Sequence, residues 1–70
     1  MEELTPTQRK VYYIVKDYID QKGYSPTFRE VARLNGNNSV ATAKFHLDAL
    51  KRKGYITFKE KLSRTLTILR

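Results

Sequence analysis

The spacing of apolar residues changes once along this chain, and the change falls at Gly54. Before Gly54 the apolar residues recur at steps of three and four, which is the spacing of one buried helical face. After it, Tyr55–Lys59 and Thr65–Leu69 are rich in residues that favour strands. Seventy residues suffice for one small core, and a chain without cysteine has no disulfide to support it. The sequence therefore predicts one α+β domain, residues 1–70, with helices first and a two-stranded hairpin last.

Two capping-box sequences mark the starts of the first two helices. In Thr5-Pro6-Thr7-Gln8 the threonine and glutamine side chains are placed to cap each other's backbone, and proline suits the first helical position. Thr27-Phe28-Arg29-Glu30 repeats the capping pattern. We expect helices over about 6–22 and 28–35, separated by Gly23 and a turn at Ser25-Pro26. Their expected core residues are Val11, Ile14, Val15, Tyr18, Ile19, Phe28, Val31, Ala32 and Leu34.

A third helix follows a short turn. Gly36-Asn37-Asn38 supplies residues that tolerate positive φ, as a tight turn between helices requires. Ser39 is a suitable N-cap for a helix over about 40–53, and Gly54 is a suitable stop. The expected inward stripe is Val40, Ala43, Leu47 and Leu50. Three helices followed by a hairpin form a winged helix-turn-helix, and in that fold the helix spanning 39–53 enters the major groove of DNA.

Positive charge is concentrated in the second half of the chain. Residues 1–39 carry six Lys/Arg and five Asp/Glu, a net +1, whereas residues 40–70 carry eight and two, a net +6. A one-sided basic surface attracts polyanions. The alternative is a solvated basic face that only keeps the protein soluble. We expect double-stranded DNA as the partner, with no membrane and no small-molecule substrate.

No motif in the sequence indicates catalysis or a cofactor. There is no glycine-rich phosphate loop, no nucleophile elbow and no zinc-finger spacing. His46 is the only histidine, and its place beside Leu47 indicates a packed helix residue rather than a metal ligand. We expect a protein that is not an enzyme and needs no cofactor or metal. The lack of cysteine, of a signal peptide and of a membrane span favours the cytoplasm.

The residues near the start of the third helix are the candidates for base reading. With its inward stripe in the core, the helix presents Ser39, Ala41, Thr42, Lys44 and Phe45 outward. Lysine can donate to guanine, whereas the alanine, threonine and phenylalanine carbons can contact a thymine methyl group. Phe45 is either a base or partner contact or is folded against a neighbouring loop.

A second set of side chains suits DNA phosphates, which fix position without reading sequence. The hairpin between Lys59 and Arg64 has no glycine or proline for a tight turn, so we expect a mobile wing that gains order on DNA. Arg64 is the candidate for the minor groove, because narrow minor grooves attract arginine. Alternatively the hairpin is a lid over the core whose tip touches nothing. The phosphate and wing candidates are Ser25, Thr27, Arg29, Lys51, Arg52, Lys53, Lys59, Lys61 and Arg64.

The chain resembles the N-terminal DNA-binding domain of LexA-type SOS repressors over nearly its whole length. The resemblance rests on Leu4-Thr5-x-x-Gln8, Gly23-Tyr24-Ser25-Pro26-Thr27, Glu30-Val31-Ala32, Gly36, Ser39, His46-Leu47, Leu50, Lys53-Gly54-Tyr55-Ile56 and Ser63-Arg64. It implies a winged helix, major-groove binding by the third helix, and repression at paired half-sites. Family members carry Ser, Asn, Ala and two Glu in the base-reading part, and here only Ser39 is retained. The resemblance therefore implies the role of this surface but not the operator.

The sequence thus predicts a sequence-specific DNA-binding domain for transcriptional regulation, most simply a repressor that occupies a promoter. Family repressors have a second, dimerising domain, so this chain is either an excised domain or a free-standing protein, bacterial or phage-encoded and nucleoid-associated. We expect a monomer alone, or a weak dimer on paired half-sites. The alternative is a protein-interaction module of the same fold, with Phe45 and Tyr55 as aromatic anchors.

Overall fold

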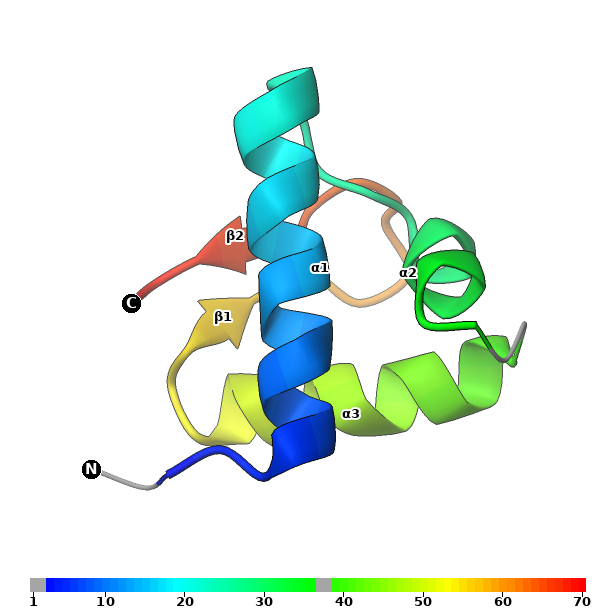
Figure 1. Ribbon diagram of the computed structural model, residues 1–70. Coiled ribbons are helices and arrows are strands. Elements are labelled where there is room, and N and C mark those ends of the chain that lie inside the picture. The colour runs from blue at the N-terminus through cyan, green and yellow to red at the C-terminus, as the bar shows by residue number, and fades with distance from the viewer. Residues whose placement is uncertain (1–2, 37–38) are drawn as a thin grey trace.

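The computed structural model describes residues 3–36 and 39–70, and in them three helices precede an antiparallel pair of strands. The elements are α1 (Pro6–Lys22), α2 (Phe28–Leu34), α3 (Val40–Arg52), β1 (Ile56–Thr57) and β2 (Thr67–Ile68). Figure 1 shows α1 crossing the molecule, with α3 below it, α2 on one side and the strands on the other. The chain between the strands passes behind α1 toward α2. The predicted α+β winged helix-turn-helix is confirmed.

The helix starts follow the predicted caps. The Thr5 hydroxyl accepts from the Gln8 N–H at 3.2 Å, and the Gln8 side chain accepts from the Thr5 N–H at 3.1 Å. Thr27 and Glu30 cap each other in the same way before α2. Ser39 caps α3 by accepting from the Thr42 N–H at 3.2 Å. Each box satisfies backbone donors that would otherwise lack a partner.

The helix ends lie within one residue of their expected places. α2 ends at Leu34 and α3 at Arg52, one residue earlier than predicted, and Asn35 and Lys53 serve as their C-caps. Gly54 follows with φ +83°, the left-handed conformation that glycine adopts without strain. The predicted turn after α2 begins at Gly36, with φ +86°, but its Asn37 and Asn38 lie outside the described residues.

The core lies where the three helices and the hairpin meet. Its buried residues are Val11, Val15, Val31, Ala32, Ala43, Leu47, Leu50, Ile56, Phe58 and Leu66. The prediction for Leu34 is wrong, because its side chain is 54% exposed. At about 100° per residue, position 34 falls roughly 110° from the centre of the face that Val31 and Ala32 bury. Leu34 instead lines a shallow groove between α1 and α2.

The strands are shorter than the predicted five residues each. Only Ile56 pairs with Ile68 and Thr57 with Thr67. Toward the hairpin tip, side chains take the place of the ladder: the Lys59 N–H donates to the Thr65 hydroxyl, and the Leu66 N–H donates to the Ser25 hydroxyl. Pairing of the two strands therefore stops where the chain that follows β1 turns toward α2. No helix in residues 3–36 or 39–70 is long and apolar enough to cross a membrane.

Candidate nucleic-acid interface

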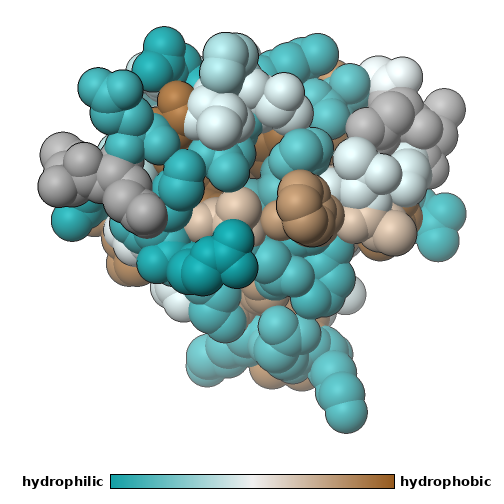
Figure 2. All heavy atoms as spheres, turned by 90° about the horizontal axis from the view of Figure 1, so that it is seen from below, coloured by the Kyte–Doolittle hydropathy of each residue, from teal (hydrophilic) through white to brown (hydrophobic). Residues whose placement is uncertain are grey.

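The outward face of α3 begins with three exposed side chains, those of Ala41, Thr42 and Phe45. Phe45 is 69% exposed, and its ring meets the edge of the His46 ring at 5.5 Å between centroids. It is therefore not folded against a neighbouring loop. Figure 2 views the molecule from the side on which α3 lies, and shows separate hydrophobic groups among hydrophilic atoms.

Lys44 lies on the same helix but its ammonium is held by two carboxylates. Its Nζ lies 3.0 Å from Asp48 on the next turn of α3 and 3.8 Å from Glu60 in the hairpin. The hydrogen bond that Lys44 donates to Asp48, assisted by the charge of Glu60, raises the pKa of Lys44 above its ordinary value. Asp48 and Glu60 are the two acidic residues of positions 40–70. Asp48 and Glu60 therefore compete with a guanine for the Lys44 ammonium.

Four cations around α3 are exposed and point to solvent. They are Arg29 on α2, Arg52 at the end of α3, and Lys59 and Lys61 in the hairpin. Within the described ranges none of the four side chains takes part in an ion pair or a hydrogen bond. They can exchange solvent and counterions for DNA phosphates without losing an internal contact.

A groove of about 570 Å³ separates α2 from the hairpin tip. Thr27, Arg29, Arg33 and Lys61 are among the residues that line it. Thr27 is the N-cap of α2, and its hydroxyl accepts from the Glu30 N–H at 3.1 Å. Of the predicted phosphate candidates, Thr27, Arg29, Lys61 and Arg64 therefore face one groove, whereas Lys59 does not line it.

Lys51 and Lys53 are engaged within the protein, unlike Arg52 between them. The Lys51 Nζ donates to the Phe58 carbonyl at 3.0 Å and lies 4.4 Å from the centre of that ring. The Lys53 Nζ donates to Gln8 at 2.7 Å and to the Glu3 carbonyl at 2.9 Å. These lysines fasten α3 to the hairpin and to the N-terminal segment. Partners up to 50 positions away leave no local signal in the sequence.

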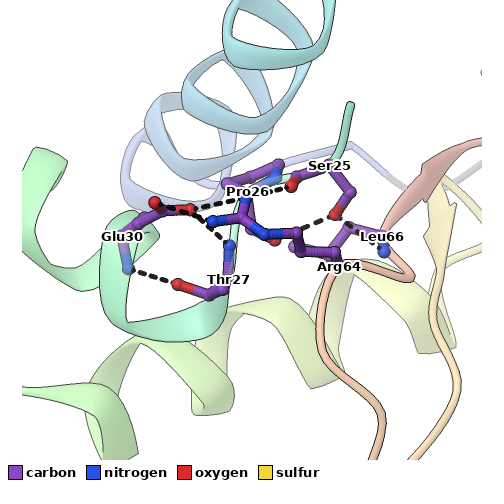
Figure 3. A network of polar contacts seen from close by, with 6 residues as sticks. All are labelled: Ser25, Pro26, Thr27, Glu30, Arg64 and Leu66. Carbon is purple, nitrogen blue, oxygen red and sulfur yellow. Dashed lines mark hydrogen bonds and ion pairs between the residues drawn. The ribbon is translucent and has the colours of Figure 1, made fainter. Parts of the chain in front are cut away.

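Arg64 joins the hairpin to the segment that enters α2 (Figure 3). Its guanidinium donates to both oxygens of Glu30, at 3.1 and 3.2 Å, and to the Ser25 carbonyl at 2.9 Å. It also lies 5.0 Å from the centre of the Tyr24 ring. The Tyr18 hydroxyl and the Glu30 carboxylate together raise the pKa of Arg64. The structure therefore makes Arg64 a clasp between elements, rather than an unattached side chain at the tip of a wing.

Glu30 receives the other half of this clasp. The Thr27 N–H, and then the Arg64 guanidinium, hold the pKa of the Glu30 carboxyl below its ordinary value. The structure agrees with the lid alternative in one respect, because Ile56, Phe58 and Leu66 are buried over the helices. It differs in another, because Arg64 of the hairpin donates to Glu30 of α2.

The structure does not favour Ser25 as a phosphate ligand. Its side chain lies in the interior, with the residue 8% exposed. The hydroxyl donates to the Pro26 carbonyl at 2.9 Å and accepts from the Leu66 N–H at 3.0 Å. Ser25 therefore supplies a hydrogen bond that holds the segment leading into β2 against the segment that precedes α2 (Figure 3).

A two-helix unit whose second helix carries an exposed N-terminal face, flanked by a hairpin, defines a winged helix-turn-helix domain. The family model for the LexA DNA-binding domain matches residues 1–65. The chain belongs to this family, and it is a DNA-binding domain.

Curated relatives agree over the whole chain. The chain is 46% identical over 69 residues to LexA repressor 2 of Geobacter sulfurreducens, covering 97% of this chain and 34% of that protein. It is 40% identical over 70 residues to the LexA repressor of Thermosipho melanesiensis, covering all of this chain and 35% of that protein. The chain thus spans about a third of the length of these relatives.

Proposed function

We propose that this domain represses transcription by binding a double-stranded DNA site with α3 in the major groove, so that the bound protein occupies a promoter. The observation that carries the proposal is the exposed face of Ala41, Thr42 and Phe45, flanked by cations from α2, α3 and the hairpin. Membership of the LexA DNA-binding domain family supports it. No cofactor and no reaction chemistry enter this mechanism, and the site of action is the bacterial cytoplasm.

Phosphate binding in this proposal belongs to Thr27, Arg29, Arg52, Lys59 and Lys61. The four charged members come from three elements, so together they fix the domain's orientation on the duplex. Lys51, Lys53 and Arg64 add positive charge to the surface potential, but their donors already have partners inside the protein. Ser39 acts through its N-cap, which sets the start of α3.

The structure gives little support to a protein-interaction module anchored by both Phe45 and Tyr55. Tyr55 is half-buried, with its ring 5.9 Å from that of Tyr12 and beneath the Arg70 guanidinium. Aromatic anchors of an interface lie together at its centre. Phe45 stands on the outward face of α3, whereas Tyr55 packs toward α1, so the two do not form one anchor.

A salt titration of binding to random-sequence duplex DNA tests the proposal. Four released counterions predict that log K falls with log salt at a slope of about −4. Arg52→Ala should reduce the slope by about one unit. Lys53→Ala is the matched control: it removes the same charge but from a side chain bound to Gln8, so its slope should change less.

Binding that does not depend on salt would contradict DNA binding and favour an apolar protein contact. Selection of bound duplexes from a random pool then tests specificity. The proposal requires a recurrent site to emerge, whereas an unselective basic surface would enrich none.

A further inference from the structure

The base-facing start of α3 presents carbon rather than hydrogen-bond donors. Ala41 and Phe45 are four positions apart, which places them one above the other on one face of the helix. Thr42 is exposed beside them. With Phe45 69% exposed, this face carries a methyl, a second methyl beside a hydroxyl, and a phenyl ring.

The polar groups nearby are engaged elsewhere. The Ser39 hydroxyl accepts the Thr42 N–H at 3.2 Å as the helix cap. The Lys44 ammonium is shared between Asp48 at 3.0 Å and Glu60 at 3.8 Å. The charged donor that is best suited to read guanine is thus ion-paired within the protein. What remains for base reading is mainly apolar.

A base pair offers one apolar group in the major groove, the C5-methyl of thymine. The same methyl, at the same ring position, is present in 5-methylcytosine and absent from cytosine and uracil. Covering an exposed phenyl ring with a methyl group removes apolar surface of both from water, which favours binding. Hydrogen-bond readout by lysine would respond to the base pair instead of to the methyl.

We propose that Phe45 is the specificity residue of this domain, and that it reads the C5-methyl group of a pyrimidine, whether thymine or 5-methylcytosine. This rests on the proposed binding of α3 in the major groove. It adds that binding responds to cytosine methylation: a C·G pair at this position is bound more tightly when its cytosine carries the methyl than when it is unmodified.

The experiment starts from the site selected from a random thymine-containing duplex pool. In that site each thymine is replaced, one at a time, by deoxyuridine, by cytosine paired with guanine, and by 5-methylcytosine paired with guanine. Affinities of the 70-residue chain are measured by fluorescence anisotropy. At the position that Phe45 contacts, removal of the methyl should weaken binding roughly four-fold in both pairs, thymine against uracil and 5-methylcytosine against cytosine.

Phe45→Ala should abolish both differences. Because Phe45 is 69% exposed, the variant should keep the melting temperature of the unchanged protein, and circular dichroism melts check this. Leu69→Ala removes a comparably exposed apolar side chain, 55% exposed, from the end of the hairpin and should leave both differences intact.

Equal affinity for thymine and deoxyuridine at every position would overturn the inference alone, and so would a Phe45→Ala protein that still distinguishes them. A selected site that contains no thymine would also overturn the inference alone. Failure to select any site would overturn the proposed function and this inference together.

Discussion

Arg64 holds the hairpin against α2 through one carboxylate, one carbonyl and one aromatic ring. Its backbone lies in the left-handed region, with φ +56°, as does that of Lys61 at +66°. These two residues make the turns that the sequence lacks glycine to make. A non-glycine residue persists in this conformation when surrounding contacts hold it, and the clasp to Glu30 provides them for Arg64.

The clasp makes stability depend on pH through Glu30. Its folded-state pKa lies below the ordinary value of 4.5, so its stabilising effect is present above that value and is lost as pH falls through the folded pKa. We therefore expect the melting temperature to fall more between pH 5 and pH 3 in the natural protein than in Glu30→Gln. Circular dichroism melts measure this difference.

Glutamine is the matched replacement because Gln8 fills the same capping position in α1. Glu30→Gln thus keeps the cap and removes only the titrating charge. The other carboxyls titrate in both proteins and cancel in the comparison. Parallel acid dependence in the two proteins would show that the Glu30 pKa is not lowered by folding.

Ser25→Ala tests the interior role of that hydroxyl. The change leaves the Leu66 N–H without its partner in a buried place, which costs about 1–3 kcal/mol of unfolding free energy. Ser63→Ala is the control, because Ser63 is exposed and, among residues 3–36 and 39–70, has no side-chain hydrogen bond. Its effect should stay within about 0.5 kcal/mol. Urea unfolding measures the free energy of unfolding of both variants, and equal values would contradict the assigned role.

At the scale of elements, the helices were predictable and the attachment of the hairpin was not. The capping boxes at Thr5 and Thr27 lie within four residues, so their sequence determines their geometry. Arg64 and Glu30 are 34 positions apart, and nothing local indicates their pairing. The outward face of α3 was predicted only in part for a similar reason. Phe45 was correctly placed outward, but the ion pair between Glu60 and Lys44 joins two elements and was not predicted.

The Lys44–Glu60 pair connects α3 to the hairpin and, in the proposed binding mode, places a carboxylate on the side that faces DNA. Glu60→Gln removes that charge and leaves Asp48 as the partner of Lys44. We expect DNA to bind roughly two- to five-fold more tightly at low salt, the range of an exposed charge interaction. Anisotropy titrations on a fixed duplex provide the measurement.

The control for Glu60→Gln is Asp17→Asn. Asp17 is exposed in the C-terminal half of α1, and the substitution changes net charge by the same amount. Figure 1 shows α3 near the other end of α1. A gain seen equally in both variants would reflect net charge alone. A gain confined to Glu60→Gln would locate the effect at the interface.

At the scale of the whole molecule, positive charge is concentrated in the part of the chain that is proposed to meet DNA. The net +7 is almost entirely in residues 40–70, and the two acids there both face Lys44. The other cations of this half are either exposed and available to phosphates or bound within the protein, where they fasten α3 and the hairpin. This arrangement favours association with any DNA and leaves discrimination to the few residues on α3.

A single domain of this size should bind a single half-site weakly, with a Kd of roughly micromolar at physiological salt. Joining two copies by a flexible linker should tighten binding to paired half-sites by about 100- to 10,000-fold, because the second contact becomes intramolecular. The same tandem on a duplex with one half-site should gain little. Nanomolar binding of one half-site by the lone chain would contradict this expectation.

The hydrogen bond from the Leu66 N–H to Ser25 joins segments 41 positions apart, with α2, α3 and β1 between them. Fraying of any one helix leaves this bond intact, because neither of its groups belongs to a helix. The Leu66 amide proton can therefore exchange with heavy water only when the hairpin and the entry to α2 separate. Its exchange rate reports the free energy of that separation, from a single resolved amide.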